Sequence, residues 1–336
     1  MRGICIVNLH KSKTSEPLTA AEMGKMWATY NGNTMAQCVL QYFLQHVDDK
    51  DIKKVVEYAL NLSNKLVDQL KFIFDKENFP IPVGFSKEDV NIGAPRLFAD
   101  EFYLHYLKYT SKAGMSIYSI AIPLVTRQDI KDFYVSTLHS TLHLITKINN
   151  TLEKKGMLMK PPVIPIPNKV DFINKQSFLK GFFGDVRPLH ALEISHLHDN
   201  IENNVASKAL LQAFSQVAKS EKVQKFFIRG KDITHKHIQK CSEKLENDDL
   251  PTPHLLDSLV TTSTFSPFSD KLMLWHKIDM FAMKIRSYAN ALSLDGRRDI
   301  GAMYAKMSMD VALFVEDGAN IMIEKGWMEE PPKSTT

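Results

Sequence analysis

The sequence predicts an all-α protein made of two tandem four-helix bundles. Two copies of one unit of roughly 150 residues follow each other along the chain. Within each copy, apolar residues recur at the i, i+3, i+4 spacing of amphipathic helices, and no run of alternating β-branched residues indicates a sheet. A length of 336 residues suits two domains. With 44% hydrophobic and 24% charged residues, the composition is that of an ordinary soluble globular protein.

The internal repeat is the strongest signal in the sequence. The first half of each copy aligns at an offset of 171 residues, and after a one-residue gap the second half aligns at 170. Matches in the same order with a single gap are hard to obtain by chance, so each copy is expected to fold alike. The matched pairs include Pro17 with Pro188, Glu22 with Glu193, Asn33 with Asn204, Pro80 with Pro251, Phe98 with Phe268, Tyr118 with Tyr288 and Arg127 with Arg297.

The repeat also sets the expected domain boundaries. We expect an N-terminal extension over residues 1–16, a first bundle over 17–162 and a second bundle over 188–332, followed by a short tail over 333–336. The linker over 163–187 contains Pro-Ile-Pro and Gly-Phe-Phe-Gly. It is expected to be ordered and apolar enough to pack between the two bundles.

Each copy contains the signals of four long helices. In the first copy, Thr19 and Glu22 form a capping box that opens the first helix, and Thr126 is expected to cap the fourth. Helices of 26–29 residues are about 40 Å long. The stretch over 79–97 contains Pro and Gly without helical periodicity and is long enough to cross a whole bundle. This connection between the second and third helices predicts the single-crossover topology of ferritin-like folds.

Three motifs carry a resemblance to a known family. They are Pro-Ile-Pro-Val-Gly-Phe at 80–85, Phe-Ser-Asp-Lys-Leu-Met at 268–273 and Glu-Asp-Gly-Ala-Asn-Ile-Met-Ile at 316–323. The chain resembles an uncharacterised family from spore-forming bacilli, whose members resemble tandem ferritin-like bundles over essentially the whole chain. The resemblance implies the fold, and it implies no activity.

Composition excludes several classes of function. The net charge of +4 forms no basic stripe, which predicts no nucleic-acid partner. Cys5, Cys38 and Cys241 are far apart and indicate reduced thiols. The longest apolar stretch, 115–125, is too short to span a bilayer, and the N-terminus lacks the apolar run of a signal peptide. We therefore expect a soluble, cytoplasmic protein that does not enter membranes.

The best functional lead is a set of polar residues that only the second copy carries. His237 takes the place of Leu66, which indicates that it points into the bundle. One candidate comes from each helix of the second copy, and three imidazoles with one carboxylate would suit iron or zinc. The predicted metal ligands are His196, His237, His276 and Asp310.

Several alternatives stay open at this stage. Glu193, His198 or Glu202 could replace one of the four ligands. The full Glu-x-x-His pattern of di-iron sites is absent, so di-iron oxygen chemistry is not expected. No Gly-rich phosphate loop or nucleophile elbow occurs, which predicts no nucleotide cofactor and no particular reaction.

Two hypotheses follow from the sequence. The first is a metal-binding protein in which the first bundle supports the second. The second hypothesis is a non-catalytic structural or interaction protein of the spore-forming lifestyle, whose interior histidines only form hydrogen bonds. The sequence does not decide whether the chain forms a homo-oligomer or binds a protein partner.

Overall fold

The structure, a computed structural model, describes residues 16–182 and 186–334. Within these ranges the chain forms eight α-helices, three short 3₁₀ helices and no strand. The α-helices are α1 (Ala20–His46), α2 (Lys50–Lys76), α3 (Asp100–Leu124), α4 (Gln128–Lys154), α5 (Ala191–Val217), α6 (Glu221–Glu246), α7 (Asp270–Leu294) and α8 (Arg298–Glu324). The 3₁₀ helices are η1 (Lys87–Asp89), η2 (Gln176–Leu179) and η3 (Asp257–Leu259).

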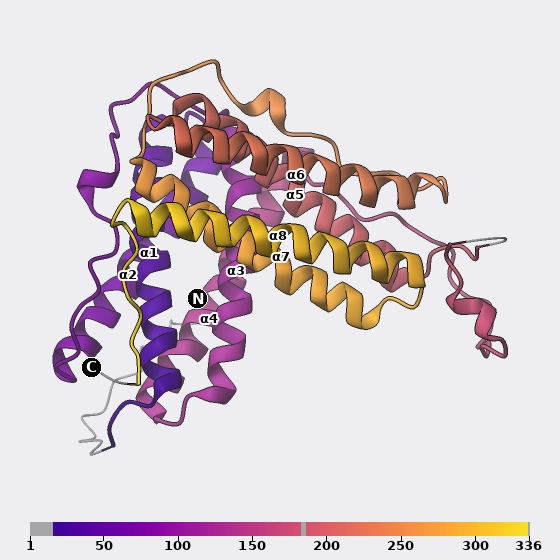
Figure 1. Ribbon diagram of the computed structural model, residues 1–336, viewed down its shortest axis with the longest axis horizontal. Helices are drawn as coiled ribbons and strands as arrows, with labels where there is room; N and C mark the ends of the chain where they lie inside the picture. Colours follow the sequence, from indigo (N-terminus) through magenta and orange to yellow (C-terminus); the bar gives the residue numbers. More distant parts are fainter. Residues whose placement is uncertain (1–15, 183–185, 335–336) are drawn as a thin grey trace.

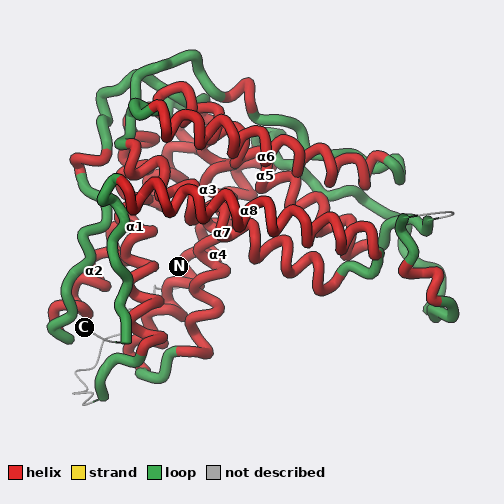
Figure 2. Tube along the Cα trace, in the orientation of Figure 1, coloured by secondary structure: helices red, strands yellow, loops and turns green. Residues whose placement is uncertain are grey.

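The predicted all-α fold with two helical bundles is confirmed. Helices α1–α4 form the first bundle and α5–α8 the second, and the two bundles cross at a steep angle (Figure 1). In each bundle the two helix pairs are joined by a long connection, over 77–99 and over 247–269 (Figure 2). These connections lie between the second and third helices, as the sequence predicts.

The helix starts show one confirmed prediction and one wrong one. The capping box at the start of α1 forms as expected, with Thr19 N–H donating to Glu22 Oε2 at 2.7 Å. Thr126 does not cap α4, because the helix begins at Gln128 and the N-cap position belongs to Arg127. Instead Glu22 Oε1 accepts the backbone N–H groups of Thr126 (3.0 Å) and Arg127 (2.8 Å). One buried carboxylate thus joins the first and last helices of the bundle.

The two connections meet along a local two-fold axis. Asn91 N–H donates to the carbonyl of Pro267 at 2.7 Å, and Thr261 N–H donates to the carbonyl of Leu97 at 3.0 Å. Residues 91 and 261 are equivalent in the two copies, as are 97 and 267, so each hydrogen bond is repeated by its counterpart. The two copies therefore pack on each other much as the subunits of a symmetric dimer do.

The seam between the bundles is apolar with a charged edge. A single cluster of buried apolar side chains runs through both bundles. At its edge, Lys108 and Lys112 of α3 form ion pairs with Glu202 of α5, and Lys112 also contacts Asp199 at 2.6 Å. The bundles are thus joined by burial of apolar surface as well as by charge pairs.

The C-terminal segment returns from the second bundle to the first (Figure 1). Glu329 accepts the backbone N–H groups of residues 83–84, both at 3.2 Å. All three tryptophans of the protein, Trp27, Trp275 and Trp327, line one recess of about 50 Å³ at this junction. Tryptophan fluorescence will therefore report on the contact between the bundles.

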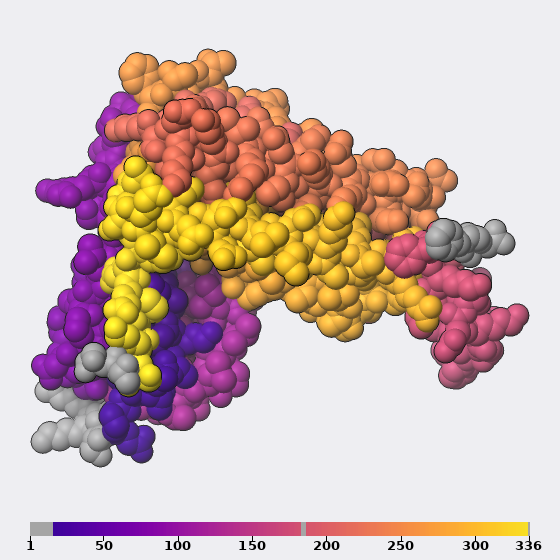
Figure 3. All heavy atoms as spheres, in the orientation of Figure 1, coloured from indigo at the N-terminus to yellow at the C-terminus, as the bar shows by residue number. Residues whose placement is uncertain are grey.

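The linker does not pack between the bundles, which corrects the expectation from its composition. It projects from the far end of the second bundle, away from the first (Figure 3). Val163 is 95% exposed, Ile166 88% and Phe172 80%. The two copies instead bury their apolar surfaces directly against each other.

Two further expectations concern thiols and membranes. Cys38 and Cys241 are buried free thiols, while Cys5 and most of the N-terminal extension lie outside the described residues. Within the part of the chain that the structure describes, no helix combines the length and apolarity needed to cross a bilayer.

Candidate functional site

The structure brings two of the four predicted metal ligands together. His237 is 1% exposed, as its alignment with Leu66 predicts, and its Nε2 lies 3.4 Å from Asp310 Oδ2. The other ring nitrogen, Nδ1, lies 3.2 Å from the hydroxyl of Tyr288. Burial and the positive charge of Lys284 lower the pKa of His237 to about 4. The Asp310 side chain is 39% exposed, so this carboxylate lies at the bundle surface and not in its interior as periodicity suggested.

The other two predicted ligands lie elsewhere. His196 Nδ1 contacts Asp295 Oδ1 at 2.7 Å, near the end of α7. His276 lies on the seam, where its Nε2 is 2.8 Å from the hydroxyl of its own counterpart, Tyr106. Among the described residues no three His, Cys, Asp or Glu side chains come close enough to hold one ion. Zinc sites use three or four protein ligands, and the pair of His237 and Asp310 does not complete such a set.

The alternative ligands have structural partners. His190 takes the place of Thr19 as the cap of α5. Glu193 repeats the role of Glu22: it accepts the N–H groups of residues 296–297 and pairs with Arg187 at 2.8 Å. Glu202 forms the seam ion pairs described above. His198 is buried on the same helix, and burial lowers its pKa.

The first bundle, which the sequence predicts only to support the second, contains a cavity. A cavity of about 120 Å³ is enclosed by all four helices of this bundle and by α7 of the second. Gly32, Thr110 and Gly114 line it and are only partly buried, so the cavity opens between α1 and α3. The sequence carries no motif for this site, because its lining is scattered over five helices.

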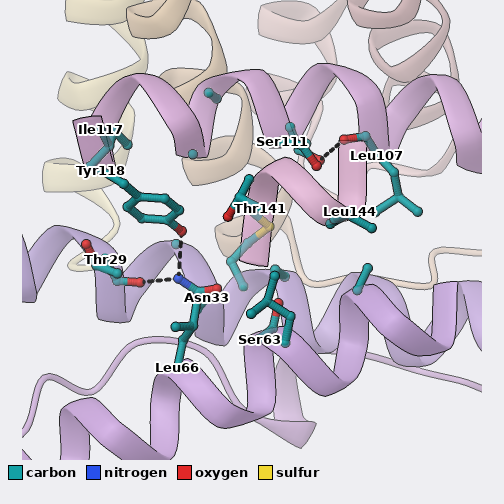
Figure 4. A pocket seen from close by; sticks show the side chains of 18 of the residues that line it. Thr29, Asn33, Ser63, Leu66, Leu107, Ser111, Ile117, Tyr118, Thr141 and Leu144 are labelled. Carbon is teal, nitrogen blue, oxygen red and sulfur yellow. Dashed lines mark hydrogen bonds between the residues drawn. The ribbon is translucent and has the colours of Figure 1, made fainter. Parts of the chain in front are cut away.

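Polar groups take part in the lining of the cavity (Figure 4). Asn33 Nδ2 donates to the carbonyl of Thr29 at 2.8 Å and to the hydroxyl of Tyr118 at 3.3 Å. Tyr118 accepts that bond, so its own O–H remains able to donate. The hydroxyl-bearing residues Ser63, Ser111 and Thr141 also line the cavity, together with apolar side chains such as those of Leu66 and Leu144 (Figure 4). The cavity can therefore hold a molecule with one polar and one apolar end.

Comparison of the two copies explains why the cavity occurs in the first bundle. Small or short residues that line it are replaced by larger ones at equivalent positions of the second bundle. The ring of Phe314 stacks on Phe226 with centroids 4.0 Å apart. It occupies the space left by Gly230, where a Cβ would lie only 2.6 Å from the ring. The replacements are Leu107 by the longer Lys277, Ser111 by Phe281, Gly114 by Lys284 and Leu144 by Phe314.

Two of these replacements bury lysines in the second bundle. Lys277 is 0% exposed and donates to Ser207 Oγ at 2.8 Å, and Lys284 donates to Thr234 Oγ1 at 3.1 Å. Burial lowers the pKa of Lys277 to about 7 and that of Lys284 well below its ordinary value. Both amines lie near the ring of Phe281. Two lysine side chains with long aliphatic stems therefore fill the space that is open in the first bundle.

One acidic residue completes the cavity from the opposite bundle. Asp279 of α7 lines it, at the position equivalent to Tyr109 of α3. Tyr109 reaches the second bundle, where its hydroxyl donates to the carbonyl of Met280 at 3.2 Å. Asp279 faces the first bundle as Tyr109 faces the second. Because aspartate is much shorter than tyrosine, it leaves room at the mouth of the cavity. Burial raises the pKa of Asp279, and the charge of Arg286 opposes that shift.

The fold and the cavity define a class: a protein of two tandem four-helix bundles, one of which holds a half-open, partly polar cavity. The chain belongs to the family described as "Protein of unknown function (DUF3231)", which matches it twice, over residues 8–170 and 177–336. This confirms the predicted membership of an uncharacterised family with two tandem copies.

Other comparisons add little about function. A solved structure from Bacillus halodurans C-125, named as a "putative spore coat protein", is 20% identical. The match covers 45% of this chain and 98% of that one, with a TM-score of 0.41. No curated protein matches the chain.

Proposed function

We propose that this protein binds a small amphipathic molecule in the cavity of its first bundle. The observation that carries this proposal is the difference between the copies. The second bundle fills its core with Phe281, Lys284 and Phe314, while the first leaves about 120 Å³ open beside unused hydrogen-bonding groups. A packed core is the default for a helical bundle, since each unfilled volume costs stability. An open, partly polar cavity is the usual form of a small-molecule site.

The second bundle supports binding in this proposal. Helix α7 closes one side of the cavity with Asp279 and Met280, while the remaining walls come from α1–α4. A ligand in the cavity therefore contacts both bundles at once. We expect binding to strengthen the contact between them, since any ligand that prefers the assembled form stabilises that form.

A pair of glycine variants tests the proposal. Gly32 lines the cavity, and a Cβ added there meets no atom within 4 Å. Gly32→Leu should therefore fill the cavity without strain. Gly24 lies two turns earlier on the same helix, is equally unobstructed and does not line the cavity, so Gly24→Leu is the matched control.

The probe is 1-butanol, and its binding is measured by ligand-observed NMR. With five heavy atoms it should bind with a Kd on the order of millimolar. We expect binding to the wild type and to Gly24→Leu, and none to Gly32→Leu. Equal binding by both variants would place the probe outside the cavity and refute the proposal. Absence of binding to all three proteins would favour the structural or interaction protein.

The predicted iron or zinc is tested separately. His237→Leu copies Leu66 of the first copy and should be tolerated sterically. Elemental analysis of protein purified without a His tag, compared with this variant, decides whether His237 and Asp310 take part in holding a metal. Stoichiometric metal that disappears in the variant would support the site, and no metal in either protein, also after reconstitution, would count against it.

A further inference from the structure

We infer that the molecule bound in the first bundle carries a cationic group, in the simplest case a primary ammonium, and that Asp279 binds it. This inference rests on the proposed binding function and adds the chemical class of the ligand. Asp279 belongs to α7 of the second bundle and is not among the residues labelled in Figure 4.

Asp279 lacks the partners that other acidic residues of the seam have. Among the described residues it forms neither a hydrogen bond nor an ion pair, whereas Glu202 is held by Lys108 and Lys112. Of the basic residues on its own helix, Lys277 and Lys284 donate to Ser207 and Thr234 of the second bundle, and Arg286, two turns further on, donates through Nε to Ser116 Oγ at 3.1 Å. The Asp279 side chain is only partly buried, so its unpaired carboxylate is open to a molecule in the cavity, and a cationic ligand would supply both a donor and the opposite charge.

Three tyrosines of α3 lie near the carboxylate, and two of them, Tyr106 and Tyr118, line the same cavity. Burial raises the pKa of Tyr106, Tyr109 and Tyr118, and the negative charge of Asp279 raises each of them further. These phenols therefore lie within electrostatic reach of the carboxylate. Aromatic rings attract cations through their electron-rich faces, and together with one carboxylate they form a common environment for an ammonium group. An anionic ligand, in contrast, would be repelled at this point.

The size and the walls of the cavity limit what the cation is attached to. A volume of about 120 Å³ is smaller than an engineered cavity of about 150 Å³ that binds benzene. It holds a short aliphatic chain but no peptide. Apolar side chains such as those of Leu62, Leu66 and Leu107 also line the cavity. A bare inorganic cation would leave this apolar wall uncovered, so a small aliphatic amine fits best.

Two probes of equal size separate charge from shape. n-Butylamine and 1-butanol differ in their polar group, and at pH 8 the amine is protonated. We expect the wild type to bind the amine at least about tenfold more tightly, since a hydrogen bond between charged groups is stronger than a neutral one. Asp279→Asn should remove this preference and leave 1-butanol binding unchanged. Asp317→Asn, an exposed acid on α8, is the control and should change neither affinity.

The outcomes distinguish this inference from the proposed function. Equal affinity of the wild type for both probes, or full amine binding by Asp279→Asn, would overturn the inference while 1-butanol binding still supports the cavity. The wild-type comparison decides even where Asp279→Asn does not fold. If neither probe binds the wild type, the proposed function fails and the inference fails with it. Amine binding should also weaken as the pH falls and Asp279 takes up a proton, whereas 1-butanol binding should not.

Discussion

The filled core of the second bundle makes a quantitative prediction for Gly230→Ala. Replacing glycine by alanine inside a helix normally stabilises a protein by about 0.5–1 kcal/mol. At Gly230, however, the new Cβ would lie 2.6 Å from Phe314 Cζ and 3.1 Å from Leu211 Cδ2. The ring of Phe314 cannot move aside, because it is packed between Phe226 and Phe281, with centroids 4.0 and 4.5 Å away.

The two effects oppose each other, and the clash is the larger. Overpacking a core costs about 1–3 kcal/mol, so the net change in the free energy of unfolding of Gly230→Ala is a loss of about 1 kcal/mol. The control Gly24→Ala, where nothing lies within 4 Å, should gain up to about 1 kcal/mol. The assay is urea unfolding followed by circular dichroism and by tryptophan fluorescence. A gain for Gly230→Ala equal to that of Gly24→Ala would refute this account of the core.

A double variant sharpens the same test. Gly230→Ala with Phe314→Leu copies the first bundle, which has Ala59 and Leu144 at these positions. The shorter side chain removes the clash, so the two changes should couple by about 1 kcal/mol or more. Strict additivity of the two single variants would show that the Cβ and the ring do not compete for space.

Three further predictions concern buried charge and exposed apolar surface. The folded pKa of Lys277, about 7, lies below its ordinary value of 10.5, so the unfolded chain binds more protons between these values. Lys277 should therefore make stability rise with pH in that window, by at most about 1.4 kcal/mol per unit, and Lys277→Met should remove this contribution in unfolding measured at pH 7–10 while that of Lys284 stays. Glu202→Gln should lower the free energy of unfolding by about 1–3 kcal/mol, because it leaves Lys108 without a countercharge and Lys112 with Asp199 alone. Breaking the exposed pair with Asp317→Asn should cost less than about 1 kcal/mol. Phe172→Ser in the exposed linker should leave Tm within about 1 °C, and a large drop would show that the linker is packed.

The local features of this fold could be predicted from the sequence. The repeat, the capping box of Thr19 and Glu22, and the amphipathic periodicity depend on neighbouring residues, so they are visible in one dimension. His237 could be placed inside its bundle because its counterpart is Leu66. Comparing equivalent residues predicts burial because equivalent positions in two similar folds face the same way.

The arrangement of the site depended on contacts between residues far apart in the chain. Periodicity gives the direction of a side chain around its helix but not its height along a neighbouring helix. It therefore predicts His196 and His276 in one site, although they lie in different places. The seam was invisible for the same reason: Tyr106 and His276 were aligned as equivalents, and nothing in the alignment shows that they touch.

The cavity is the clearest case of what tertiary structure alone decided. Its volume is the difference between what five helices enclose and what their side chains fill, and no single residue predicts that difference. The sequence determined the two bundles, since each helix needs an apolar face to bury. Only the packed structure shows which bundle keeps a cavity. Phe314 fills the core of the second bundle, whereas the short Asp279 of that bundle reaches the edge of the cavity in the first.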